Sequence, residues 1–271
     1  MLIRRNDGFP RIMGVLNLTP DSFHEASRLD STASAVSRAI EMVEQGADWI
    51  DIGGESTRPG AALIDAEEEA GRVIPVVRAV REALPDACIS IDTRRASVAR
   101  QALDAGADMV NDVSALSDSN MAELIANRGC PVCIMHMQGT PEDMQDNPSY
   151  QDVVDDVRAS LSKAFCALTD LGVDPSMVIA DHGIGFGKTL EHNLSLLASG
   201  RDVVPNDRMP LMWGVSRKTM FSHLLGREST DDRLAGSLGV AARAKDKGVD
   251  IIRVHDVAEH ADLFAAMGAL R

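Results

Sequence analysis

One unit recurs along the chain: a short apolar segment with a polar end, a loop, and an amphipathic segment with helical spacing. Glycine and a short polar joint separate each helical segment from the next apolar one, as at residues 46–48, 106–108 and 248–250. Glycine after a helix favours the left-handed cap that ends it, and a short joint returns the chain to the sheet. The pattern therefore predicts strands that alternate with helices and pair in parallel.

Eight segments have strand character, and this number favours a closed barrel. They lie near residues 12–18, 48–53, 88–92, 109–113, 131–136, 177–181, 210–215 and 251–255. Eight such units in 271 residues are typical of a (β/α)8 TIM barrel, whose usual length is about 250 residues. Periodicity alone leaves an open doubly wound sheet as the alternative. Because no linker divides residues 1–271, we expect a single α/β domain, a TIM barrel.

Three local features of the expected helices can be compared with a structure. Apolar residues at steps of three and four predict a long helix over residues 151–171. Asp65, followed by Glu68, is a capping pair for the helix that ends near Leu84. Pro75 lies inside that second helix and should bend or interrupt it.

Composition excludes several classes of function. The net charge of −14 argues against nucleic acid as a partner, because phosphate backbones need an excess of Lys and Arg. No run of 18 apolar residues occurs, so no membrane partner is expected. The first residues lack the apolar stretch of a secretion signal, and we therefore expect a cytoplasmic protein. Four cysteines are too few for a disulfide framework at this length, and Cys130 and Cys133 are interpreted as buried thiols.

Polar side chains stand at the carboxyl ends of all eight predicted strands, where TIM barrels carry their sites. They are Asn17, Asp51, Asp92, Asn111, Asp112, His136, Asp181, Ser216, Arg217, Lys218, Arg253 and His255. Carboxylates and amides form one group and basic residues another. This division favours a ligand with a polar ring at one end and phosphate at the other.

Seven motifs follow the strands in order, at residues 17–23, 53–60, 111–113, 136–139, 183–188, 214–218 and 253–255. Together they make the chain resemble the dihydropteroate synthase family over roughly residues 12–257. The resemblance implies condensation of p-aminobenzoate with 6-hydroxymethyl-7,8-dihydropterin diphosphate, a step of folate synthesis and a sulfonamide target. Residues 183–189 are not a phosphate-binding P-loop, because His182 stands where that motif needs glycine.

The resemblance also implies which residues form each part of the site. Asp92, Lys218 and Arg253 would be catalytic. The pterin would be bound by Asp92, Asn111, Asp181 and Lys218, with Met137 against the ring, and the diphosphate by Asn17, Arg58, Arg253 and His255. Asn17 would also ligate Mg²⁺, and p-aminobenzoate would contact Phe23, Thr57, Pro59, Phe186 and Ser216. His136 is interpreted as a packed histidine rather than a ligand, and a homodimer is implied by the family.

Two departures from the family pattern leave alternatives open. Residues 24–27 are His-Glu-Ala-Ser where the family commonly has Ser-Asp-Gly-Gly, and His182 replaces a proline beside Asp181. A pterin-binding methyltransferase barrel shares the pterin end of such a site, but should lack the segments at 56–59 and 216–218. A non-catalytic pterin-binding relative is the second alternative.

Overall fold

In the computed structural model, eight parallel strands pair in chain order, and β1 also pairs with β8, so that the sheet closes into a barrel. The strands are β1 (Arg11–Asn17), β2 (Trp49–Gly53), β3 (Cys88–Asp92), β4 (Met109–Asp112), β5 (Val132–Met135), β6 (Val178–Asp181), β7 (Leu211–Trp213) and β8 (Ile251–Val254). The structure describes residues 3, 5, 7–18, 28–56, 63–140 and 143–270, with side chains of the first helix from residue 32 onward. The predicted TIM barrel is confirmed, and closure excludes the open sheet.

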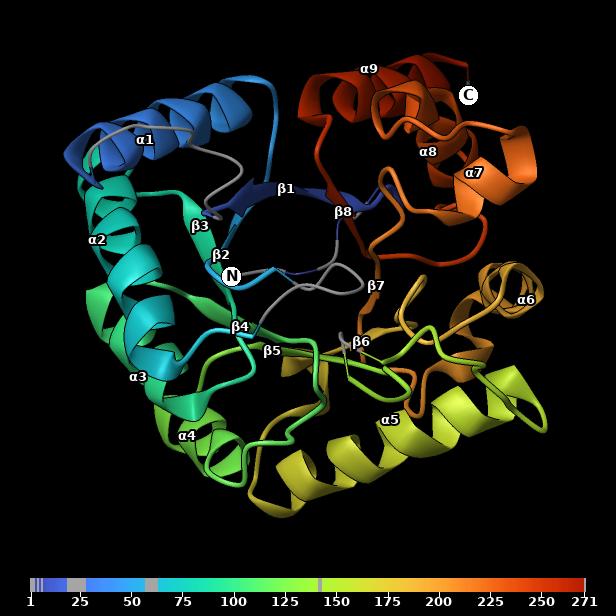
Figure 1. Cartoon of the computed structure of the whole chain (residues 1–271), viewed down its shortest axis with the longest axis horizontal. Coiled ribbons are helices and arrows are strands. Elements are labelled where there is room, and N and C mark those ends of the chain that lie inside the picture. Colours follow the sequence, from blue (N-terminus) through green and yellow to red (C-terminus); the bar gives the residue numbers. More distant parts are fainter. Residues whose placement is uncertain are drawn as a thin grey trace.

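Helices surround the barrel and cover the outer faces of its strands (Figure 1). They are α1 (Arg28–Glu44), α2 (Ala66–Ala83), α3 (Ala96–Ala105), α4 (Met121–Arg128), α5 (Val153–Asp170), α6 (Leu190–Ser199), α7 (Met220–Leu225), α8 (Leu234–Ala241) and α9 (Val257–Ala269). Short 3-10 turns η2 (Pro175–Met177), η3 (Gly200–Val203) and η4 (Asp231–Arg233) join some of them to their neighbours. Among the described residues, no helix combines the length and the apolar character needed to cross a membrane.

The expectations for individual helices hold with one exception. The long helix is α5, and the Asp65 side chain caps α2 by accepting a hydrogen bond from the backbone N–H of Glu68 at 2.8 Å. Pro75 does not interrupt α2, which continues through it. The lost backbone hydrogen bond is offset because the apolar face of α2, including Val73 and Val77, is fully buried against the barrel.

Alternation along the strands sorts side chains between two apolar regions. Outward-facing residues pack with the helices in one large core, whereas inward-facing residues fill the barrel. The filling is Ile3, Met13, Trp49, Met109, Cys133, Ile179, Met212 and Ile251. The interpretation of Cys130 and Cys133 as buried thiols is confirmed.

Two residues further along four of these strands, the inward-facing positions become polar. Trp49, Met109, Ile179 and Ile251 are followed at that spacing by Asp51, Asn111, Asp181 and Arg253. Because side chains of a strand repeat with a period of two, these polar groups stand directly above the apolar filling. The barrel therefore carries a layer of buried polar groups at the carboxyl ends of its strands.

Candidate active site

A cavity of about 300 Å³ opens above this polar layer. It is lined by Asn17, Glu55, Ser56, Asp92, Met144, Gly185, Phe186, Gly214, Ser216, Arg217, Lys218, Thr219, Thr230, Arg233, Arg253 and His255. The lining holds four cationic and two carboxylate side chains, and the Glu55 carboxylate is already paired with Arg94 and Arg95 at 2.8 Å each. Cationic side chains thus outnumber carboxylates in the lining of this cavity, in a chain with an overall excess of negative charge.

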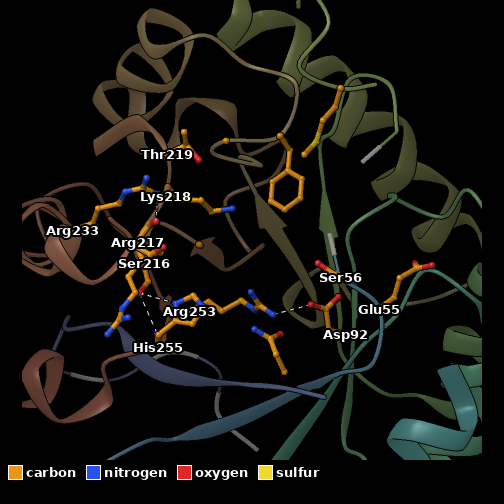
Figure 2. Close-up of a pocket in the computed structure, with 16 residues that line it drawn as sticks. Glu55, Ser56, Asp92, Ser216, Arg217, Lys218, Thr219, Arg233, Arg253 and His255 are labelled. Carbon is orange, nitrogen blue, oxygen red and sulfur yellow. Dashed lines mark hydrogen bonds and ion pairs between the residues drawn. The ribbon is translucent and has the colours of Figure 1, made fainter. Parts of the chain in front are cut away.

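Arg253 joins two carboxylates at the floor of this cavity. Its Nε donates to Asp51 Oδ2 at 2.6 Å. Its Nη2 donates to Asp92 Oδ2 at 2.8 Å (Figure 2). The Asn111 amide donates to the same Asp51 oxygen at 3.0 Å. Asp51 is completely buried, and its Oδ1 has no hydrogen-bond partner within the described residues. The network fixes the two carboxylates and the amide relative to one another before a ligand arrives.

Burial controls the protonation of the facing groups. Removal from water raises the pKa of Asp92 from 3.8 to about 7, opposed by attraction to Arg253 and reinforced by repulsion from Asp51. Burial lowers the pKa of Lys218 to about 8, against the attraction of Asp181. The Lys218 ammonium lies 4.0 Å from the centre of the Phe186 ring, as a cation–π contact. Both groups therefore change charge near neutral pH.

Asp181 lies at the end of β6 with only a small part of its surface exposed. Its Oδ1 accepts a hydrogen bond from the Gly183 N–H at 2.7 Å. Its Oδ2 faces Gly214, where an added Cβ would lie 3.6 Å from that oxygen. Because Gly214 lines the cavity and has no side chain, the carboxylate is left accessible to a ligand from that side.

The segments after β7 and β8 contribute Ser216 and His255 to the cavity lining. Ser216 Oγ lies 3.0 Å from His255 Nδ1 and accepts the His255 backbone N–H at 3.2 Å. Burial, together with the charges of Arg253 and Arg217, lowers the pKa of His255 to about 4. His255 is therefore a neutral hydrogen-bonding group at neutral pH, not the cation that its residue type suggested.

The structure gathers most of the predicted site residues. Those that line the cavity are Asn17, Asp92, Phe186, Ser216, Lys218, Arg253 and His255. Asn111 and Asp181 lie in the buried layer at its floor. Phe23, Thr57, Arg58 and Pro59 fall outside the described residues. In Figure 2, Lys218 and Arg253 extend into the cavity, and Asp92 and Ser56 lie across from them.

Met137 is not among the residues that line this cavity. It lines a separate cavity beside α5, together with Met135, Ser114, Thr140 and Lys163. Met135 pairs with Asp181 in the sheet register, and a contact between Met137 and a pterin ring stays a prediction.

Other functional residues were not among those predicted. Asp51 had been noted only as a polar strand end, although it holds both Arg253 and Asn111. Arg217 and Arg233 also line the cavity. Arg217 is bound by Asp256, with Nε–Oδ2 at 2.9 Å, and Arg233 donates to three backbone carbonyls. Arg217 follows a predicted strand, inside the 214–218 motif, whereas no signal in the sequence separates Arg233 from ordinary surface residues.

Comparison with known proteins matches this arrangement to one family. The family model described as pterin binding enzyme matches residues 13–255. Dihydropteroate synthase of Haemophilus influenzae is 44% identical over 254 residues, covering 94% of this chain and 91% of that protein. The Escherichia coli K12 synthase is 44% identical over 250 residues, covering 92% and 88%.

Solved structures give the same result. The Yersinia pestis dihydropteroate synthase, in complex with a sulfonamide drug, superposes with a TM-score of 0.90 at 39% identity, covering 98% of this chain and 96% of that one. The Xanthomonas albilineans synthase in complex with 7,8-dihydropteroate has a TM-score of 0.86 at 35% identity, covering 97% and 94%.

Proposed function

This chain belongs to the pterin binding enzyme family, among its dihydropteroate synthases, and from that premise we propose how its residues carry the reaction. The enzyme is a transferase that joins p-aminobenzoate to 6-hydroxymethyl-7,8-dihydropterin diphosphate and releases diphosphate. The observation that carries the residue assignment is the network of Arg253 with Asp51 and Asp92 at the floor of a cavity lined by more cationic side chains than carboxylates.

The pterin is assigned to the buried polar layer. Its ring presents hydrogen-bond donors and acceptors along one edge, and Asp92, Asn111 and Asp181 offer carboxylates and an amide at fixed positions. Lys218 supplies a donor from the other side of the cavity. Met137 is proposed, as from the sequence, to pack against the ring.

The diphosphate is assigned to the side formed by Asn17, Arg253 and His255, with Arg58 from outside the described residues. Mg²⁺ fits this side. The Asn17 side chain has no hydrogen-bond partner within the described residues, so its carbonyl oxygen can act as a ligand. Described residues hold no cluster of three His, Cys, Asp or Glu side chains for a metal. Mg²⁺ commonly keeps water and substrate phosphate oxygens as ligands, and when bound it would offset the charge of the diphosphate.

The p-aminobenzoate is assigned to Phe186 and Ser216, with Phe23, Thr57 and Pro59 from outside the described residues. The Phe186 ring offers an apolar contact. Ser216 Oγ, already in contact with His255, offers a hydroxyl for the carboxylate. This places the second substrate between the pterin and the solvent.

The reaction breaks the bond between the pterin methylene carbon and the diphosphate oxygen, and forms a bond from that carbon to the amine nitrogen. The diphosphate leaves with the bonding electrons, and the amine then loses a proton. We propose a dissociative path in which the cationic pterin is stabilised by ionised Asp92, while Lys218 and Arg253 stabilise departing charge. No general base is assigned, because the barrier of the proposed path lies in the departure of the diphosphate.

Formation of 7,8-dihydropteroate tests the proposed reaction. The protein is incubated with both substrates and Mg²⁺, and 7,8-dihydropteroate is followed by chromatography, with p-aminobenzoate omitted as the control. Pterin binding without product would favour the non-catalytic alternative. Methyl transfer from a methylated folate to a corrinoid would favour the methyltransferase. Loss of product with a chelator, restored by added Mg²⁺, tests the metal.

We also propose a cytoplasmic homodimer. Leu194 on α6 and Leu224 and Leu225 on α7 are 40%, 46% and 47% exposed, and the two helices are in contact. Neighbouring exposed leucines of this kind mark association surfaces. Sedimentation analysis of the wild type and of Leu225→Asp tests the dimer, and cell fractionation tests the location.

A further inference from the structure

The loop between β6 and α6 forms one wall of the cavity and is pressed against the segment after β5. Gly183 has a φ of 66°, and an added Cβ would lie 1.9 Å from the carbonyl oxygen of His136. At Gly187, with a φ of 60°, an added Cβ would lie 2.6 Å from the carbonyl oxygen of Gln138. Only glycine tolerates this approach. Any displacement of the loop would move Phe186, which faces Lys218.

Lys188 holds the two segments together from behind the cavity. Its Nζ lies 3.1 Å from His136 Nδ1, 3.1 Å from the His136 carbonyl oxygen and 2.9 Å from the Phe186 carbonyl oxygen. Burial lowers the pKa of His136 to about 3, so its neutral ring can present Nδ1 as an acceptor. Three acceptors thus meet the three N–H groups of one ammonium. Lys188 is almost completely buried and has no ion pair within the described residues.

The charge of Lys188 acts on Asp181. The negative charge of Asp181 raises the pKa of Lys188 against the effect of burial, and the ammonium lowers the pKa of Asp181 in return. The other groups that act on Asp181 are the Gly183 N–H, Lys218 and Arg253. The groups that face Lys188 are His136, His182, Asp181 and Lys218.

We propose that Lys188 is a positioning residue for pterin binding: its ammonium ties the Gly183–Gly187 loop to His136 and adds a buried positive charge that favours the ionised form of Asp181. The proposal rests on the assignment of Asp181 to the pterin. Lys188 lines no part of the cavity and acts through Asp181 and Phe186.

Direct binding of 6-hydroxymethyl-7,8-dihydropterin, without diphosphate, separates the two roles of Lys188. Lys188→Gln keeps a donor and removes the charge, whereas Lys188→Arg keeps the charge. Tyr150→Phe loosens the same loop without changing charge, because the Tyr150 hydroxyl donates to the Gly187 carbonyl at 2.6 Å. Lys163→Met removes an exposed lysine on α5 and is the matched control. Calorimetry gives the dissociation constants across the pH range, and thermal unfolding shows that each variant is folded.

The proposal predicts that the loss of pterin affinity in Lys188→Gln depends on pH. Lys188→Gln should bind pterin about tenfold more weakly than the wild type near pH 6, because loss of the ammonium raises the pKa of Asp181 and disfavours its ionised form. The difference should shrink above pH 7, because burial lowers the pKa of Lys188 itself to about 7. Lys188→Arg should stay within about threefold of the wild type near pH 6, since the guanidinium remains charged. Asp92 titrates in the same range in every variant and does not affect the comparison.

A loss of affinity that is equal at all pH values and matched by Tyr150→Phe would overturn the electrostatic role and leave a structural one. A Lys188→Gln variant that binds like the wild type near pH 6 would overturn the proposal altogether. Formation of dihydropteroate by the wild type is measured separately. Absence of product with intact pterin binding would count against the proposed function, while the binding series still decides the role of Lys188.

Discussion

Asp92→Asn should remove activity and stabilise the ligand-free protein. Burial raises the pKa of Asp92 to about 7 even though Arg253 is 2.8 Å away, so the ionised form is disfavoured in the folded state. The rise from 3.8 to about 7 corresponds to about 4 kcal/mol, at 1.36 kcal/mol for each pH unit. Asn resembles the neutral carboxylic acid in shape and avoids this free energy. Arg253 keeps its contact with Asp51, so that its charge is not left unpaired.

The pH dependence of the free energy of unfolding shows where Asp92→Asn should be more stable than the wild type. A carboxyl group whose pKa is raised on folding contributes stability below its unfolded pKa, and this stability is lost as pH rises through the folded pKa. Near pH 4 the wild type and Asp92→Asn should therefore unfold with similar free energies. Between about pH 4 and 7 the wild type should lose stability relative to the variant, by up to about 4 kcal/mol, and the difference should be constant above.

Urea unfolding of both proteins at several pH values measures this difference, with the exposed carboxylate in Asp86→Asn as a matched control. Pterin affinity should fall at the same time, by about 1.5–3 kcal/mol for one charged hydrogen bond. A variant that is less stable than the wild type at pH 8 would refute the reasoning, because the pair with Arg253 would then outweigh burial. Turnover within twofold of the wild type would remove Asp92 from the reaction.

Three further predictions concern other parts of the site. In calorimetry, His255→Ala should weaken binding of a pterin diphosphate more than binding of the unphosphorylated pterin. Arg253→Ala should weaken binding of both ligands. It should also lower the free energy of unfolding by about 3–5 kcal/mol, because it leaves two buried carboxylates without their cation. The alkaline limb of kcat/KM should lie near pH 8, where Lys218 loses its proton, and Lys218→Arg should move that limb upward; an unmoved limb would exclude this residue as its source. Exchange of residues 24–27, outside the described residues, for Ser-Asp-Gly-Gly should lower the KM for p-aminobenzoate modestly and leave that for the pterin unchanged.

Most of the fold could be predicted because barrel strands and helices have different periods. The strand boundaries agree with the predicted segments to within a few residues, as in β3 and β8. The interruption of α2 considered for Pro75 does not occur, because the buried face that offsets the local effect of proline depends on tertiary packing, which the sequence does not show. A prediction from local sequence alone fails where many tertiary apolar contacts stabilise a helix.

The candidate site could be predicted in position but not in its internal pairing. Polar strand ends identified Asp92, Asp181 and Arg253 without showing which groups touch. The link from Arg253 to Asp51 spans 202 positions in the sequence, and only barrel closure brings β8 and β2 to the two sides of β1. The neutral state of His255 could not be predicted either, because it follows from burial beside arginines.

The same pairing resolves how an acidic chain can bind anionic substrates. The carboxylates that contact the pterin side are compensated where they stand: Asp51 and Asp92 share Arg253, and Glu55 is held by Arg94 and Arg95. Their negative charge is therefore reduced, although Arg253 alone does not cancel two carboxylates. Charges on the outer helices are separated from the cavity by the barrel wall and are screened by salt over about 8–10 Å. The potential that a diphosphate meets is consequently set by the few cations lining the cavity, and the net charge of the chain has little bearing on it.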